Sequence, residues 1–436
     1  MSILQKYEKI RLVDIMLIML IVVCPLPRAY TMYNFMSGPE NRPFGNTLGI
    51  TIPLLFFILM YFITIGKNNF YIYYKSPLNY FFFFAVISFF FPIQGRIWQI
   101  TLIGIFKLLI IWGLYDILLK KFSFANYEKC LDWGLSIGLL IESALGFLYV
   151  FAHVSIPYVS IGFPYDRNGF SRMTGAMAHP GDFSLYISII YFYYICKLLF
   201  KKDKKSIKYI ILSLVDLVLS GARAMIITSI LISVIIFWKK YQRNWIVKLV
   251  IMSGIIIASI GVYHSSFYQN LFMEENFFET ITARLIHWRI GFQIMFSSFN
   301  NFLFGVGLNN HVDYIASHFS TLSYLITDTS VVDAFFIQNN PIHNSLLVVG
   351  TELGIVGLFL YISIYIVGII NAWKILKAYP KYKSQCTYVI GCLFIFLLYS
   401  FQGWALMKDM GWVLFILVNA FLYSIKKDAK KLNKKE

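Results

Sequence analysis

The stretch HNSLLVVGTELGIVGLFLYISIYIVGII, residues 343–370, couples a polar start to an apolar run long enough to cross a bilayer. His343 heads the run, and Gly350, Gly354 and Gly357 each follow it by close to a whole number of helical turns. The spacing therefore predicts one open, glycine-lined helix face below a titratable imidazole. A bulky lipid or sugar could approach that face.

The composition and the other apolar runs indicate a membrane protein. Of the 436 residues, 58% are hydrophobic and only 14% are charged, which excludes a soluble globular domain. We expect an all-α polytopic membrane protein, a single integral membrane domain over residues 1–436 with about 12 transmembrane helices. The predicted spans lie near residues 12–30, 47–65, 78–93, 97–119, 131–153, 180–200, 206–221, 223–238, 245–263, 343–371, 385–402 and 409–425. The first run has no small-residue cleavage site after it, so we expect it to be retained.

The segment between the ninth and tenth spans, residues 264–342, is too long for a simple connection. We expect an extracytoplasmic loop with an interfacial helix from Thr280 to Ser297, because Arg284, His287, Trp288 and Gly291 share one stripe there. The next segment, FGVGLNNH at residues 304–311, has the glycines of a nucleotide loop. No strand precedes it and no GK[ST] follows, so we do not expect nucleotide binding.

The cations are divided between the two sides of the predicted membrane. The formal net charge is +17, and lysines occupy every second loop, so the positive-inside rule makes those loops and both termini cytoplasmic. Their spread over separate loops favours contact with anionic membrane lipid over nucleic-acid binding. The lysines concerned are Lys67, Lys75, Lys120, Lys121, those in 201–208, Lys239, Lys240, those in 374–383 and those from Lys426 onward.

The opposite side carries arginine instead, where topology disfavours cations. Guanidinium groups bind phosphate or carboxylate through two parallel hydrogen bonds, which gives these arginines a ligand-binding interpretation. Snorkelling or helix capping is the alternative for any one of them. For Arg223 a structural ion pair with Asp216, seven residues earlier, also stays open. The set is Arg28, Arg42, Arg96, Arg167, Arg172, Arg223, Arg284 and Arg289.

The start of the helix near residue 180 is a second candidate for anion binding. His179, Pro180, Gly181 and Asp182 open that helix, and free amides at a helix start suit an anionic ligand.

Metal and redox chemistry are not expected. Asp-x-Asp is absent from the sequence, and no cysteine lies in a long loop. His153, His264, His311 and His318 lack metal-ligand spacing, so we interpret them as structural or solvated. We expect no metal and no cofactor.

Taken in order, several motifs resemble the O-antigen ligase and O-antigen polymerase superfamily of bacterial membrane glycosyltransferases. The resemblance covers roughly Ser171 to Tyr361. It comprises the Arg172-x-x-Gly loop with His179-Pro180, the Ser220-Gly-Ala-Arg223 turn, Arg284 with Trp288, the Phe304-Gly-x-Gly segment, and H-N-x9-G-x-x-G from His343 to Gly357. Members often carry an asparagine where this chain has Asp182.

The resemblance implies a type C glycosyltransferase-like fold in the bacterial inner membrane, with its site on the periplasmic or outer face. It implies transfer of glycan from a polyprenyl (undecaprenyl) diphosphate carrier to a hydroxyl of a glycan or lipid-linked acceptor, without a metal and with inversion. A chain-length regulator is a further candidate partner. Surface polysaccharides such as O-antigen, capsule or exopolysaccharide are the products that such enzymes make.

The residues suggest a mechanism within this class. Arg172, Arg223 and Arg284 would hold the leaving diphosphate, with Arg289 assisting. His343 would accept the proton of the attacking hydroxyl, with Asn344 orienting it, because imidazole titrates near neutrality. A helix N-cap or a buried polar contact is the alternative role for His343.

Three activities remain open at this point. Polymerisation of repeat units is favoured slightly over ligation of a finished glycan to a lipid A-core or protein. A lipid-glycan flippase or transporter is a third alternative, because Lys107, Glu142, Asp216 and Glu352 are ionisable groups within or near apolar runs. No repeat relates the first and second halves of the sequence, which disfavours the transporter.

Overall fold

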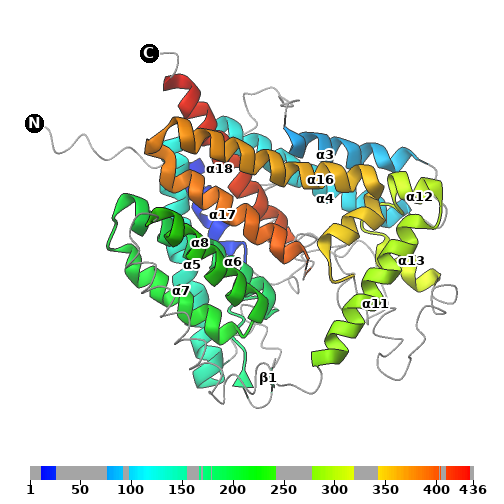
Figure 1. Cartoon of the computed structure of the whole chain (residues 1–436), viewed down its shortest axis with the longest axis horizontal. Coiled ribbons are helices and arrows are strands. Elements are labelled where there is room, and N and C mark those ends of the chain that lie inside the picture. The colour runs from blue at the N-terminus through cyan, green and yellow to red at the C-terminus, as the bar shows by residue number, and fades with distance from the viewer. Residues whose placement is uncertain are drawn as a thin grey trace, which may run out of the picture.

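The computed structural model describes residues 11–25, 76–91, 98–154, 166–167, 170–177, 179–241, 277–318, 342–401, 403 and 409–432. Nearly all of this is helical (Figure 1). The helices are α1 (Leu12–Val23), α3 (Pro77–Ile87), α4 (Trp98–Lys121), α5 (Phe124–Ala152), α6 (Pro180–Lys201), α7 (Ser206–Ser220), α8 (Arg223–Lys240), α11 (Phe277–Phe296), α12 (Phe299–Phe304), α13 (His311–Ser317), α16 (Ser345–Ala378), α17 (Lys383–Ser400) and α18 (Asp409–Leu432). Short 3₁₀ turns, η3 (Ser88–Phe90) and η5 (Pro380–Tyr382), and a two-residue antiparallel ladder of β1 (Asp166–Arg167) with β2 (Phe170–Ser171) complete it.

The expectation of an all-helical membrane protein is confirmed for the described residues. Within the part of the chain that the structure describes, six helices are long and apolar enough to cross a bilayer: α4, α5, α6, α16, the segment Pro380–Ser400, and Met410–Leu432 within α18. α1, α7 and α8 coincide closely with further predicted spans but are shorter or less apolar. The predicted spans 47–65 and 245–263 lie outside the described residues, so the total of about 12 stays a prediction.

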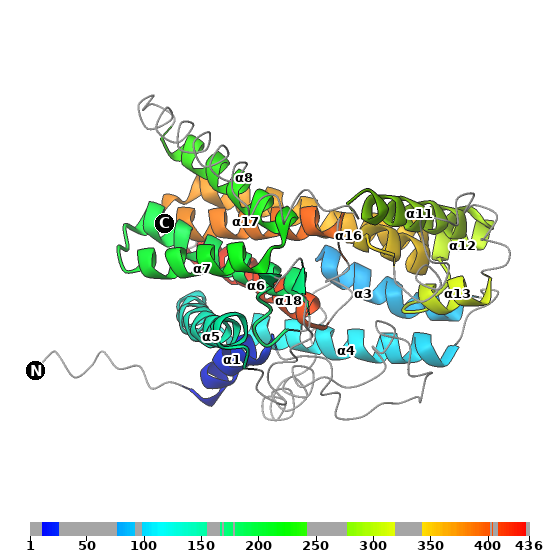
Figure 2. The same ribbon diagram turned by 90° about the horizontal axis from the view of Figure 1, so that it is seen from below.

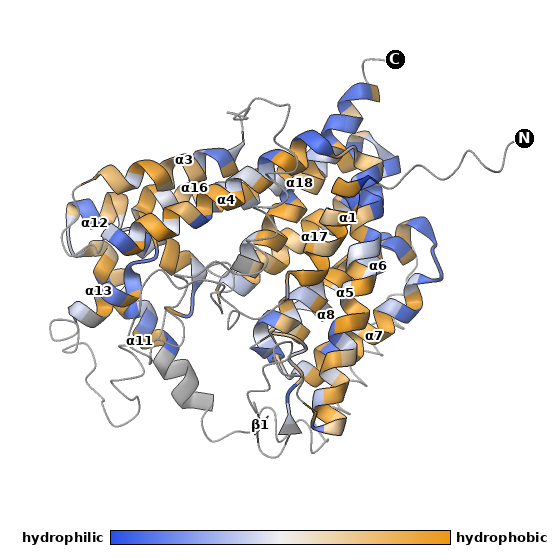
Figure 3. Ribbon diagram, turned by 180° about the vertical axis from the view of Figure 1, so that it is seen from behind, coloured by the Kyte–Doolittle hydropathy of each residue, from blue (hydrophilic) through white to orange (hydrophobic). Residues whose placement is uncertain are grey.

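The helices form a bundle around α6, which is buried along nearly its whole length. α5, α7, α8 and α17 all pack against it. Apolar side chains dominate the helix bodies, and hydrophilic residues concentrate near the helix ends (Figure 3). At the other side of the molecule, α11, α12 and α13 gather around the first half of α16 and α3 (Figure 2).

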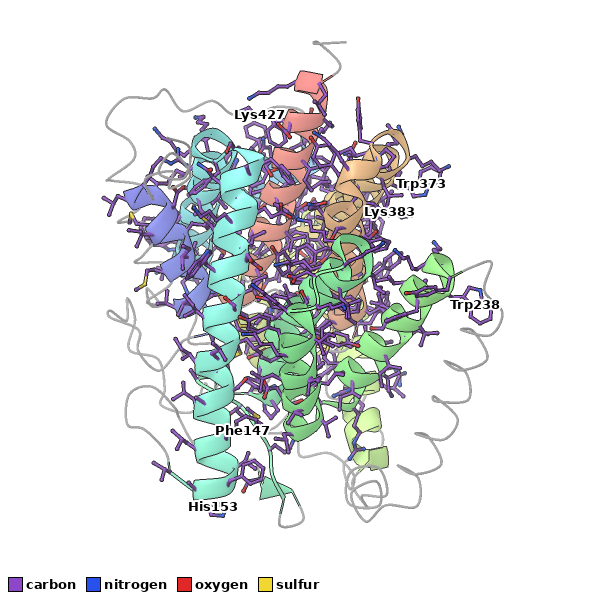
Figure 4. All side chains as sticks on the ribbon, turned by 90° about the vertical axis from the view of Figure 1, so that its left-hand side faces the viewer. Phe147, His153, Trp238, Trp373, Lys383 and Lys427 are labelled. Carbon is purple, nitrogen blue, oxygen red and sulfur yellow. The ribbon has the colours of Figure 1, made fainter. Side chains whose placement is uncertain are left out.

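The lysines collect at one end of the bundle. Basic residues fill the last turns of α4, α6, α8, α16 and α18. Lys383 and Lys427 lie toward this end and His153 lies at the opposite one (Figure 4). Lys201 Nζ is 2.5 Å from Glu128 Oε1, and Lys197 Nζ is 2.7 Å from Asp132 Oδ1, so part of the positive charge is paired between α5 and α6. The segregation of lysine that the loops predict is thus present in three dimensions.

The five cysteines are all buried with free thiols. They lie in or beside helices, where the apolar runs predict them.

Candidate functional site

His343 lies two residues before α16, at the end of the bundle opposite the lysines, and its side chain is half-buried. The helix is capped by Asn344, whose Oδ1 accepts hydrogen bonds from the amides of Leu346 at 3.0 Å and Leu347 at 3.1 Å. The amide and Oγ of Ser345 both donate to the carbonyl of Gly403, at 3.0 and 2.7 Å. The capping role proposed as an alternative for His343 therefore belongs to Asn344. His343 is left at the edge of a rigid helix start.

A second histidine contacts His343. The ring centroids of His343 and His287 are 5.8 Å apart, with the rings inclined at 61°. His287 comes from the middle of α11 and is fully buried, beside Ile290 and Gly291, which face α16. The sequence stripe that contains His287 predicts the helix correctly. It did not identify His287 as a neighbour of His343, because 56 residues separate them along the chain.

The glycines of α16 do not form an open face, which corrects the expectation from helical spacing. Gly354 has φ +67° and ψ −170°, so α16 is broken there, and the periodicity that relates His343 to Gly357 does not hold. The segment after α12 crosses the helix at this break. The amide of Val306 donates to the carbonyl of Thr351 at 2.8 Å, and that of Gly307 donates to the carbonyl of Glu352 at 3.0 Å.

Two glycines permit this crossing. A Cβ on Gly305, which has φ +72°, would overlap the backbone of Glu352, and a Cβ on Gly354 would overlap the backbone of Leu303 and Phe304. Gly350 and Gly357 are also buried, against Met295 and Leu353. The glycine pattern therefore serves close packing of α11 and α12 on α16, and it fixes the half-helix that follows His343.

We predict that Gly354→Ala destabilises the protein by at least about 2 kcal/mol, because it adds both backbone overlap and left-handed strain. Thermal unfolding of the purified protein in detergent would measure the loss. Gly391→Ala is the matched control, because its Cβ would meet nothing closer than Phe192 at 3.5 Å. Equal melting temperatures for the two variants would show that the break at Gly354 is not needed.

Glu352 pairs with His311 beside the same crossing. His311 Nδ1 lies 2.6 Å from Glu352 Oε1, and both side chains are buried. This agrees with the structural interpretation of His311, and it gives Glu352 a partner other than His343. The pair joins the start of α13 to α16 and reinforces the two backbone hydrogen bonds from Val306 and Gly307.

Arg172 lies against the turn that carries Arg223. Arg172 Nε donates to the carbonyl of Ser220 at 2.9 Å, and the amide of Met173 donates to that of Leu219 at 3.0 Å. Gly221, with φ +60°, ends α7, and α8 begins at Arg223. The two arginines therefore share one corner at the lysine-poor end of the bundle.

The predicted pairing of Asp216 with Arg223 is not formed. Asp216 Oδ2 accepts from Ser143 Oγ at 2.5 Å, and its Oδ1 has no hydrogen-bond partner among the described residues. The turn at Gly221 explains the difference, because the seven-residue helical spacing ends before Arg223 is reached.

The start of α6 does not offer free amides, which corrects a second expectation. His179 is the N-cap, and its Nδ1 accepts from the amide of Gly181 at 3.0 Å. The amides of Asp182 and Phe183 donate to the carbonyl of His179 at 3.1 and 3.2 Å. With these amides occupied and a carboxylate in the first turn, this helix start is a poor anion site.

Arg284 and Arg289 lie on different sides of α11, although both are exposed. Arg284 is about 60° around the helix from His287, whereas Arg289 is about 160° away. Asp182 and Arg284 also lie close enough to the Tyr399 hydroxyl to act on it electrostatically. Arg284 therefore lies on the same side of α11 as His287 and near Tyr399, whereas Arg289 lies on another side, and its assisting role stays a prediction.

Among the described residues, no group of three or more histidines, cysteines or carboxylates is placed to hold a metal ion. The site is composed of imidazole, guanidinium, carboxylate and phenol groups. Such a set can bind an anion, accept a proton and hydrogen bond to hydroxyls.

A comparison with known families matches residues 209–362 to a family model described as O-antigen ligase. Over this part of the chain, the match supports the resemblance that the motifs carry to the O-antigen ligase and polymerase superfamily, whose members are glycosyltransferase-like membrane enzymes. The matched range includes Arg223, Arg284, His343 and the break of α16 at Gly354. It does not include Arg172, His179 or Tyr399. No curated protein matches the chain.

Proposed function

We propose that the chain polymerises oligosaccharide repeat units carried on polyprenyl diphosphate, for a surface polysaccharide. The observation that carries this proposal is the contact of His343, at the start of α16, with His287, which lies one turn after Arg284 on α11, within the range that matches O-antigen ligases. A proton acceptor beside a guanidinium group supplies the two functions that transfer from a glycosyl diphosphate requires.

In the proposed reaction, an acceptor hydroxyl oxygen attacks the anomeric carbon of the lipid-linked sugar. The bond from that carbon to the diphosphate oxygen breaks, and the diphosphate leaves with the electron pair. His343 takes the hydroxyl proton as the new glycosidic bond forms. The amide of Asn344 donates to the carbonyl of Ile342 across His343, and Ser345 donates to the carbonyl of Gly403 just after it, so the imidazole needs little reorganisation.

Arginine is the proposed ligand of the diphosphate. Arg284 lies one turn before His287 on α11, and Arg172 and Arg223 share the corner between β2 and α8. Guanidinium groups stabilise the charge that develops on the leaving diphosphate. We expect the lysine-rich end of the bundle to face the cytoplasm, which sets the site on the outer face of the inner membrane.

Ligation of a finished glycan to a lipid or protein acceptor is the second candidate, and the description of the matched family favours it. Both reactions use the same bond changes and differ in the acceptor.

Transport is less well supported, because the buried carboxylates that suggested it have local partners. Glu142 Oε2 accepts from the amide of Ala176 at 2.8 Å, Asp216 accepts from Ser143, and Glu352 pairs with His311.

The test is a reaction of the purified protein with a polyprenyl diphosphate-linked repeat unit in the presence of EDTA. A polymerase gives a ladder of carrier-linked oligomers. A ligase gives transfer only when a lipid-core or protein acceptor is added. Consumption of no donor under either condition would refute both activities, and an absolute requirement for a divalent cation would refute the arginine-based mechanism.

A further inference from the structure

The hydroxyl of Tyr399 lies where three elements of the candidate site meet. Tyr399 is in the last turn of α17, and a Cβ added to Gly181 at the start of α6 would be 2.8 Å from its hydroxyl oxygen. The same point is 2.9 Å from His179 Nδ1. Three residues after the end of α17, the carbonyl of Gly403 accepts the hydrogen bonds of Ser345 that anchor the start of α16. Tyr399 is thus tied to the elements that carry His179 and His343.

The described residues make no hydrogen bond to this hydroxyl, and its oxygen reaches the molecular surface although Tyr399 as a whole is only 8% exposed. A hydroxyl at the accessible end of a largely buried ring can donate one hydrogen bond and accept others from a bound molecule. Gly181 lets the start of α6 approach the hydroxyl closely, because a Cβ at that position would collide with it. A ligand group is a natural partner for it.

The charges around Tyr399 select the kind of ligand. Asp182, 6% exposed, and Arg284 act on the hydroxyl from α6 and α11. Asp182 repels a phosphate, and the amides at the start of α6 are occupied, so the diphosphate is directed toward Arg284. The Asp182 carboxylate accepts hydrogen bonds, and the Tyr399 phenol both donates and accepts them. Together they match the hydroxyl groups of a sugar.

We propose that Tyr399 and Asp182 form a binding site for sugar hydroxyl groups, adjoining the diphosphate site at Arg284. The inference rests on the proposed function and assigns the two parts of the donor to different places. The carrier's diphosphate lies on the α11 side, and the glycan lies over the start of α6. Tyr399 and Asp182 are then substrate-binding residues that set which glycan is accepted.

The experiment measures steady-state kinetics of purified Tyr399→Phe and Asp182→Asn with the polyprenyl diphosphate-linked repeat unit. We expect each variant to raise KM about tenfold, which corresponds to about 1.4 kcal/mol, with a smaller change in kcat. Inhibition by undecaprenyl diphosphate, which has no sugar, should stay at the wild-type level in both variants and weaken in Arg284→Ala.

Tyr388→Phe is the matched control, because Tyr388 is a buried tyrosine on the same helix, near its lysine-rich end. Melting temperatures report folding. Wild-type KM in Tyr399→Phe and Asp182→Asn, with an active wild-type protein, would overturn the sugar site alone. Equal weakening of undecaprenyl diphosphate inhibition in Tyr399→Phe and Arg284→Ala would overturn the proposed division. An inactive wild-type protein would instead refute the proposed function on which the inference rests.

Discussion

Replacing His343 with alanine is expected to slow glycosyl transfer by about 10²- to 10⁴-fold, the usual contribution of a general base. The loss should appear in kcat, because the base acts on a proton that moves only in the reaction. Folding should be retained, since the N-cap is Asn344 and the imidazole is half-buried. The measurement is donor turnover by the purified variant, beside its melting temperature.

His318→Ala is the control for this variant. His318 stacks on Tyr314 with centroids 4.1 Å apart just after α13, so it belongs to a different surface, and its removal should leave turnover near the wild-type rate. Added imidazole should restore part of the activity of His343→Ala if the missing group is a base. Full activity of His343→Ala would remove His343 from the mechanism.

Replacing Arg284 with alanine is expected to reduce kcat by about 10²- to 10³-fold, as removal of one group that stabilises developing negative charge does elsewhere. Arg284→Lys should recover only part of the rate, because an ammonium group cannot make the paired hydrogen bonds of guanidinium. Rates of purified variants at saturating donor test this, and inhibition by undecaprenyl diphosphate reports binding separately.

Arg289→Ala provides a comparison on the same helix. Both arginines are exposed, so loss of charge from α11 is common to the two variants, and only the side of the helix differs. We expect a much smaller loss for Arg289→Ala, since its side chain is directed away from His287. Equal losses would mean that α11 acts through its overall charge and that Arg284 has no specific position.

The helices of this chain are predictable from sequence because their signal is local. Apolar runs predict both ends of α6, the end of α5 and the start of α16 to within a few residues. α5 begins seven residues earlier and α16 ends seven residues later than expected. Pro180 marks the start of α6, because the fixed φ of proline suits the first position of a helix. The lysines in the last turns mark helix ends, because cations are favoured at helix C-termini. The stripe on α11 likewise predicts a helix.

The site is less predictable, because its contacts join distant segments. Helical spacing assumes an unbroken helix, and the break at Gly354 arises because the segment from Gly305 to Gly307 crosses there. Nothing local in the sequence distinguishes that glycine from Gly350. Tyr399 is 217 residues from Asp182, and no motif singles it out from the 30 tyrosines of the chain. Only the packing of α17 against α6 brings the two together.

The most direct test of the account compares wild-type protein with His343→Ala and Arg284→Ala in one assay. Each purified protein is given a polyprenyl diphosphate-linked repeat unit and EDTA, and released undecaprenyl diphosphate is measured with time. The account predicts release by the wild type and a loss of at least about 10²-fold in each folded variant. Wild-type release that persists unchanged in both variants would contradict it.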